Sequence, residues 1–88
     1  MFIDCNKYKL TLDKIDSHMV GVLDSEIASH PNNISHMTGV PVIAVCLYLI
    51  TFIHPKGSKH YEYLNSRYES IIDFYGYTTI LPFEGETL

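Results

Sequence analysis

Apolar side chains recur at intervals of three and four residues in the first third of the chain, which is the spacing of one face of a helix. This pattern predicts an amphipathic helix over residues 12–29. Thr11 is expected to cap its start, and Asp13 and Asp16 to lie in its first turn, where carboxylates favour the positive end of the helix dipole. The apolar face is formed by Leu12, Ile15, Met19, Val22, Leu23 and Ile27.

A second pattern of the same kind predicts a helix that begins after Ser58 and ends at Gly76. A serine hydroxyl is suited to cap the start of a helix, and a glycine in the left-handed conformation commonly ends one. The face of this helix that is predicted to pack on the core consists of Tyr61, Leu64, Tyr68, Ile71, Ile72 and Tyr75.

Two shorter helices are predicted between these stretches. Residues 30–33 are expected to end the first helix, because Pro31 disfavours helical geometry at the residue before it. A helix of little more than one turn then follows over residues 34–38. Pro41 suits the first turn of a third helix, expected to end near Phe52, since its missing N–H would be unpaired there in any residue.

The two ends of the chain have the character of strands. Residues 2–10 alternate partly between apolar and polar side chains, and residues 77–83 are rich in aromatic and β-branched ones. These terminal segments are predicted to form a short β-sheet, followed by a frayed tail over residues 84–88. The predicted fold class is therefore α+β, mainly α, and 88 residues make a single domain over residues 1–88.

The order of elements between residues 10 and 52 resembles that of a known family. It runs helix, His-Pro linker, short helix, Gly-Val-Pro turn and helix, and it resembles the winged helix-turn-helix domains of small bacterial and phage regulators. The resemblance implies a helix-turn-helix-like three-helix core whose turn glycine allows two helices to cross. The residues that carry it are His30-Pro31, Ile34, Ser35, Thr38-Gly39-Val40-Pro41, Val45 and Tyr48, and in the family the places of Ile34, Val40, Val45 and Tyr48 pack between the helices.

The third helix departs from this family in its chemistry. Family members read the major groove of DNA with polar side chains, whereas the matching places here are occupied by Pro41, Val42, Ile43, Ala44, Cys46 and Leu47. Apolar groups and one thiol offer almost no hydrogen bonds to bases. The sequence thus argues against a recognition helix of the usual kind.

Three explanations remain for a third helix that is apolar on every side. It can be the central core helix, covered by the fourth helix and the last strand. Its outer face, with Ile43 and Leu47, can instead contact a second copy or another protein. The third explanation is membrane insertion, although the apolar run of fourteen residues from Val40 to Ile53 is shorter than the roughly 20 residues that a spanning helix needs.

The charge of the chain bears on its partners. Ten Asp and Glu against six Lys and Arg give a formal net charge of -4, the wrong sign for a protein that mainly neutralises phosphates. Contacts to DNA phosphates, if made, would come from Lys56, Lys59 and Arg67. Cys5 and Cys46 stand far apart without a CxxC motif or an apolar leader, which favours two free thiols in a reducing cytoplasm.

Motifs that carry chemistry are missing from the sequence. Five histidines are present, but His30 with His36 and His54 with His60 are each separated by a loop and lack the spacing of a zinc site. The chain contains no GxSxG, HExxH or glycine-rich phosphate loop. We therefore expect no metal, no cofactor, no catalytic residues and no enzymatic activity.

Tyrosine is the unusual residue of the composition, with seven copies, of which five gather in one region, namely Tyr61, Tyr63, Tyr68, Tyr75 and Tyr77. Tyr63, Arg67, Ser70 and Phe74 form a second stripe on the last helix, opposite its predicted core face. Tyr, Arg and Phe side chains together are typical of contact surfaces between proteins. Incidental exposure, or packing on the last strand, is the alternative interpretation of this stripe.

The function expected from these observations is binding of another protein or of a second copy, without catalysis and away from membranes. Small size, acidity and the missing base-reading residues are typical of phage or mobile-element regulators and inhibitors of host proteins, including the anti-CRISPR type. The alternative is a dimeric DNA-binding regulator of winged helix-turn-helix type. The partner-binding residues expected are Tyr63, Arg67, Phe74, Ile43 and Leu47, and the alternative would use Lys56, Lys59 and Arg67.

Overall fold

Strand β1, Phe2–Asp4, leads directly into a turn of 3-10 helix, η1, Cys5–Tyr8. The Asp4 side chain caps this turn by accepting a hydrogen bond of 3.1 Å from the backbone N–H of Asn6. Residues 9–14 are helical, so Thr11 lies inside a helix and the prediction that it caps one is wrong. The computed structural model describes residues 1–14, 30–54 and 56–83, and most of the helix predicted over residues 12–29 lies outside these residues.

Helix α2, His30–Thr38, is longer than the sequence pattern predicts. Residues 30–33, the predicted linker, belong to it. The reason is that Pro31 lies in the first turn of α2, where a backbone N–H would have no partner in the helix and its absence removes no hydrogen bond. Pro31 is also buried, so its ring adds to the core.

The turn that follows α2 is held by hydrogen bonds that the backbone and the side chain of Ser35 make. Gly39 has a φ of +78°, which favours glycine, and its N–H donates to the carbonyl of Ser35 at 2.8 Å. The Ser35 hydroxyl donates to the carbonyl of Val40 at 2.5 Å. The tight turn predicted at Gly39 is therefore confirmed.

Helix α3, Val42–Tyr48, continues without a break into a π-helical segment, η2, Leu49–Ile53. Pro41 is the N-cap residue of α3, and the N–H of His54 donates to the carbonyl of Leu49, five residues earlier, at 2.9 Å. The third helix thus covers the predicted range, but its last part is widened. The apolar pattern does not predict this widening, because the residues of η2 are equally compatible with an α-helix.

The side chains of η2 extend the packing of the third helix. Leu49 is buried at the start of η2, and Ile50, Phe52 and Ile53 are partly buried against the core. The ring of Phe52 lies 4.9 Å from that of Tyr48, between centroids. The apolar run therefore contributes to the core beyond the end of α3.

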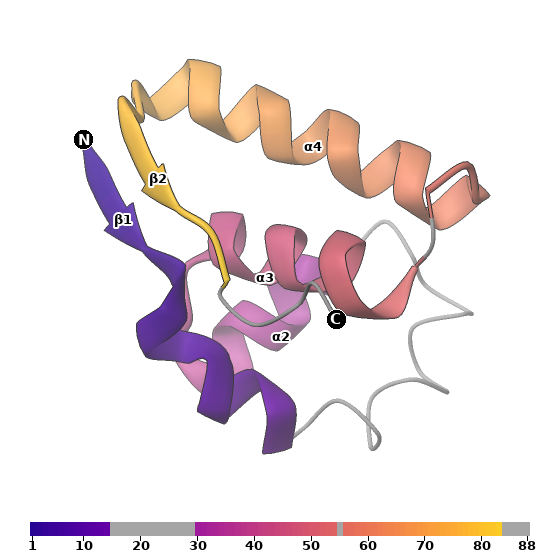
Figure 1. Ribbon diagram of the computed structural model, residues 1–88, viewed down its shortest axis with the longest axis horizontal. Helices are drawn as coiled ribbons and strands as arrows, with labels where there is room; N and C mark the ends of the chain where they lie inside the picture. Colours follow the sequence, from indigo (N-terminus) through magenta and orange to yellow (C-terminus); the bar gives the residue numbers. More distant parts are fainter. Residues whose placement is uncertain (15–29, 55, 84–88) are drawn as a thin grey trace.

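Helix α4, Lys59–Tyr75, has the start and the end that its sequence predicts. The Ser58 hydroxyl oxygen accepts a hydrogen bond of 3.1 Å from the N–H of Tyr61, so Ser58 is the N-cap. Gly76 ends the helix in the left-handed conformation with a φ of +71°. In Figure 1, α4 runs along one side of the molecule and lies over α3.

Strand β2, Thr79–Leu81, pairs in parallel with β1, and the two form a sheet of their own among the described residues. Ile3 is opposite Ile80 in the register, and both pack on or against the core. Phe2 and Leu81 belong to the alternate positions of their strands, and their side chains are exposed. The short sheet predicted from the terminal segments is confirmed, but the strand expected over residues 2–10 ends at Asp4, because the Asp4 side chain caps the 3-10 turn that follows.

The core is centred on α3, which contacts both α2 and α4. Ile43, Ala44, Val45 and Cys46 are each at most 1% exposed, so the central-core explanation of the third helix is the one that holds for these residues. The four places that pack between helices in the resembling family are also buried, namely Ile34, Val40, Val45 and Tyr48. The architecture is α+β and mainly α, as predicted.

The helices of the described residues are short in comparison with a membrane span. None of them is by itself long and apolar enough to cross a membrane. Residues 31–38 and 42–53 reach the necessary length and hydropathy only as a pair, and the pair is bent by 119°.

Candidate functional site

One side of α4 carries two rows of side chains that are spaced four residues apart, as neighbouring ridges on a helix are. The first row is Tyr63, Arg67, Ile71 and Tyr75, and the second is Ser66, Ser70 and Phe74. Together these seven residues line a hollow of about 480 Å³, which we name the α4 groove. Ser66 and Ser70 are the two short side chains of its lining.

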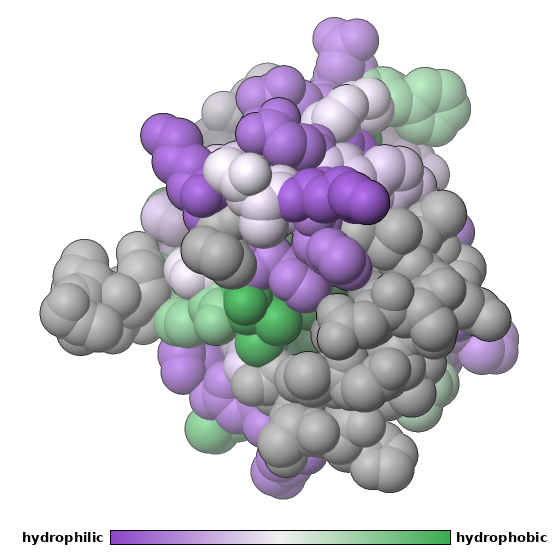
Figure 2. All heavy atoms as spheres, turned by 90° about the vertical axis from the view of Figure 1, so that its right-hand side faces the viewer, coloured by the Kyte–Doolittle hydropathy of each residue, from purple (hydrophilic) through white to green (hydrophobic). Residues whose placement is uncertain are grey.

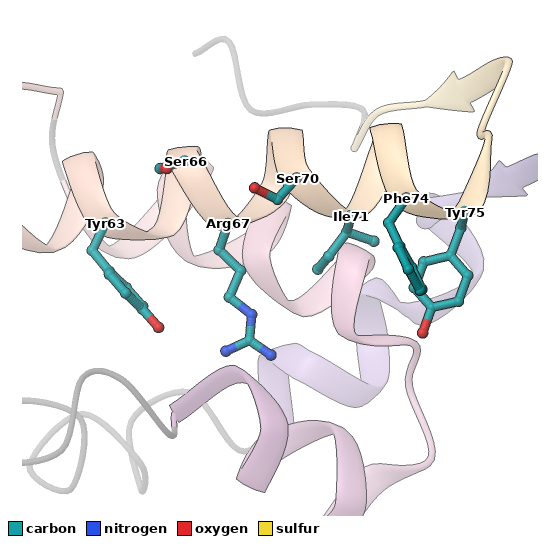
Figure 3. A pocket seen from close by; sticks show the side chains of 7 residues that line it. All are labelled: Tyr63, Ser66, Arg67, Ser70, Ile71, Phe74 and Tyr75. Atoms are coloured by element: carbon teal, nitrogen blue, oxygen red, sulfur yellow. The ribbon is translucent and has the colours of Figure 1, made fainter.

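The side chains of the α4 groove differ in how they lie. Tyr63, Arg67 and Phe74 extend from the same side of the helix, and Phe74 lies beside Tyr75 at its far end (Figure 3). The rings of Phe74 and Tyr75 meet edge to face, with centroids 4.8 Å apart. Two aromatic rings therefore close one end of the groove, and Tyr63 stands near the other.

Three aromatic side chains of the groove are exposed to solvent. Phe74 is 79% exposed, Tyr75 56% and Tyr63 38%. Exposed aromatic rings that gather around one hollow are typical of contact surfaces, because each ring removes a large apolar area from water when it is covered. The stripe predicted from Tyr63, Arg67, Ser70 and Phe74 is thus gathered at one site.

Arg67, at the middle of the groove, contacts α2. Its guanidinium donates a hydrogen bond of 2.7 Å to the side-chain oxygen of Asn32. Arg67, Ile71 and Tyr75 also line a second hollow of about 310 Å³, together with residues at the starts of α2 and α3.

Two of the predicted partner-binding residues are not on this surface. Ile43 is 1% exposed, so a partner has almost no access to its side chain, and the prediction that it lies on a contact face is wrong. Leu47 is partly buried and packs against the core. The physical reason is that α4 and α2 both pack on α3, which leaves α3 without a broad open face.

Tyr75 is the groove residue that the sequence pattern assigns incorrectly. The pattern groups it with Tyr61 and Tyr68 on the core face, yet its side chain is more than half exposed and lines the groove. The spacing contains a signal for this, since Tyr75 follows Arg67 and Ile71 at intervals of four residues. Near the end of a helix, little remains of the core to cover such a ring.

The basic residues of the DNA-binding alternative are divided between two places. Lys56 and Lys59 are exposed at the start of α4, where the surface is mostly hydrophilic in Figure 2. Arg67 lies eight residues after Lys59, about 12 Å further along the helix axis, and faces Asn32. The three basic residues are therefore divided: Lys56 and Lys59 are close to each other in the sequence, whereas Arg67 lines the α4 groove.

A polar contact joins the start of the chain to the third helix. The Tyr48 hydroxyl donates to one carboxylate oxygen of Asp13 at 2.6 Å, and Lys9 contacts the other at 2.9 Å. Both hydrogen bonds stabilise the charged carboxylate and lower the pKa of Asp13. The sequence predicts a first-turn role for Asp13, whereas in the structure this residue links the start of the chain to Tyr48.

Both cysteines are free thiols in the core, as the sequence favours. Burial, with the nearby charge of Asp4, raises the pKa of the Cys5 thiol to about 11. Burial raises the pKa of the Cys46 thiol to about 12, although the charge of Arg67 lowers it somewhat. Thiols of this kind are largely protonated at neutral pH and react slowly.

The histidines come closer together than their sequence spacing indicates. The rings of His54 and His60 stack with centroids 4.6 Å apart, although a loop separates the two residues in the sequence. Within residues 1–14, 30–54 and 56–83, no group of three or more His, Cys, Asp or Glu side chains is arranged to hold a metal ion.

No protein-family model, curated protein or solved structure matches the chain. The resemblance to winged helix-turn-helix domains therefore stays a prediction, and function has to be argued from the surface itself.

Proposed function

We propose that the protein is a small non-enzymatic regulator or inhibitor that acts by binding a protein through the α4 groove. The observation that carries this proposal is the gathering of Tyr63, Phe74 and Tyr75, all exposed, around Arg67, whose guanidinium contacts Asn32. Aromatic and arginine side chains contribute most of the binding energy in many protein interfaces. An apolar or aromatic side chain of the partner is the chemistry that fits this groove.

The experiment compares the proteins that three tagged chains capture from a lysate after nuclease treatment. The chains are the wild type, a Tyr63→Ala and Phe74→Ala double variant, and a Phe2→Ala control. Phe2 is a suitable control because it is also an exposed aromatic residue but lies in β1, outside the groove. A protein that the wild type and the control retain and the double variant loses supports the proposal, whereas equal capture by all three contradicts it.

One observation favours a second candidate, a DNA-binding regulator. The bend of 119° between the α2 residues 31–38 and the helical residues 42–53 lies within the range of about 90–120° that is usual for helix-turn-helix motifs. The burial of Ile43 and Cys46 argues against base readout by α3, so binding would rest on phosphate contacts. A duplex shift that weakens with salt and with Lys56→Glu and Lys59→Glu would support this candidate, and an unchanged shift would contradict it.

A further inference from the structure

The central residues of α4 repeat at intervals that read the same in both directions. Tyr63, Arg67, Ser70 and Phe74 follow one another at intervals of four, three and four residues. Alternating intervals of three and four are the spacing by which two helices pack side by side over their length. A stripe with symmetric intervals can therefore be matched by a second copy of itself running in the opposite direction.

The side chains at these positions also suit an antiparallel match. In that arrangement Tyr63 is level with the second copy's Phe74, and Arg67 is level with the second copy's Ser70. Each exposed aromatic residue is then level with another aromatic residue, and each arginine is level with a serine. A parallel match would instead place Arg67 level with the second copy's Arg67, whereas the antiparallel match sets the two arginines about 4.5 Å apart along the helix axis, so like charges repel more in the parallel match.

We propose that the partner of the α4 groove is a second copy of this chain, bound with the two α4 helices antiparallel. Phe74 of each copy covers the groove of the other beside Tyr63, so the same surface is used twice around a twofold axis. This inference rests on the proposed function, because it names the protein that the groove binds. It accounts for the exposure of Phe74, which in one copy alone is the most exposed large apolar side chain of the described residues.

The size of the surface determines how strong this dimer is. The stripe from Tyr63 to Phe74 covers about 17 Å of helix. Stable interfaces of standard size bury about 800 Å² on each partner, and a stripe of this length provides less. Association is therefore expected to be weak and to depend on concentration in the micromolar to millimolar range.

The first test is sedimentation equilibrium from micromolar to millimolar concentration. The mass of the wild type is expected to rise from 10.1 kDa toward twice that value. Phe74→Ser should weaken the association by at least about tenfold, because the twofold symmetry removes an aromatic contact at each end of the interface. Phe2→Ser is the matched control and should associate like the wild type; a wild type that stays monomeric throughout overturns the proposal.

The second test determines the direction of the helices. Tyr63→Cys and Phe74→Cys chains are oxidised separately and as a mixture, and disulfide-linked dimers are measured on gels without reductant. The native Cys5 and Cys46 are each 0% exposed, so links form through the introduced thiols. The antiparallel arrangement predicts links in the mixture that greatly exceed those of either chain alone. Links in each chain alone, equal to those in the mixture, overturn it.

The two proposals fail in different ways. If the chain stays monomeric, but the Tyr63→Ala and Phe74→Ala double variant loses a different captured protein, the self-association is wrong and the proposed function is supported. If the chain stays monomeric and capture is also unchanged, both proposals are wrong. Circular dichroism of each variant shows whether its fold is retained, and the exposure of Phe74 predicts that it is.

Discussion

The hydroxyl of Tyr48 is a polar group on a helix that otherwise carries apolar side chains and one thiol. It lies at the end of α3 and donates to Asp13, a residue 35 positions earlier in the chain. Its ring is packed edge to face against Phe83, with centroids 5.6 Å apart. One tyrosine thus joins the start of the chain, the third helix and the segment after β2.

We predict that Tyr48→Phe lowers the free energy of unfolding at neutral pH by about 0.5–1 kcal/mol, the net value of one partly exposed hydrogen bond. The pKa of Asp13 is lowered in the folded protein, so the charged carboxylate stabilises the fold above its unfolded pKa of about 3.9. That contribution is lost as pH falls through the lower, folded pKa. Chemical denaturation at neutral pH and at pH values below about 4 measures it.

The Asp13→Asn variant and the double variant complete a mutant cycle with Tyr48→Phe. The two single changes should not add, because each removes the same hydrogen bond. Simple additivity, with equal acid sensitivity of wild type and Tyr48→Phe, would show that the contact contributes nothing to stability.

At the scale of elements, the ends of α4 were predictable because they depend on local chemistry. Ser58 accepts from the N–H of Tyr61, and Gly76 takes a φ of +71°, each as the sequence predicts. The start of α2 was not predictable, since the effect of Pro31 depends on whether it stands before a helix or in its first turn. The exposure of Tyr75 and the burial of Ile43 depend on how α4 packs over α3, which a single helix pattern does not contain.

Gly76→Ala is expected to lower the free energy of unfolding by about 1 kcal/mol. An added Cβ would meet no atom within 4 Å, so the cost arises from the left-handed backbone and not from a clash. Thermal unfolding followed by circular dichroism measures this loss. Ser66→Ala, in the middle of α4, is the control and should leave stability unchanged or slightly raised; an equal loss in both variants would exclude a specific effect of the Gly76 backbone.

At the scale of the whole molecule, α4 has two faces that differ in exposure. Leu64 is 0% exposed in the core, whereas Phe74 is 79% exposed in the α4 groove. The helical spacing predicts this division correctly for both residues. It does not predict that the two strands pair in parallel, because pairing between distant segments is determined by the complete fold.

Leu64→Ala is expected to lower the free energy of unfolding by about 2–5 kcal/mol, because it removes buried methyl groups and leaves a cavity. Phe74→Ala should change it by no more than about 0.5 kcal/mol in dilute solution. Urea denaturation of both variants compares the two values. Similar losses would mean that Phe74 belongs to the core and would remove it from the proposed contact surface.

The pairing of β1 with β2 joins residues that are 77 positions apart, from Phe2 to Thr79. During synthesis at about 5–20 residues per second, roughly 4–15 s pass between the synthesis of β1 and that of β2, so β1 has no strand to pair with during this time. Closing so long a loop is also slow compared with forming the local turns of α4. The sheet is therefore expected to form last, and Ile3 stays accessible to chaperones or to other growing chains until it does.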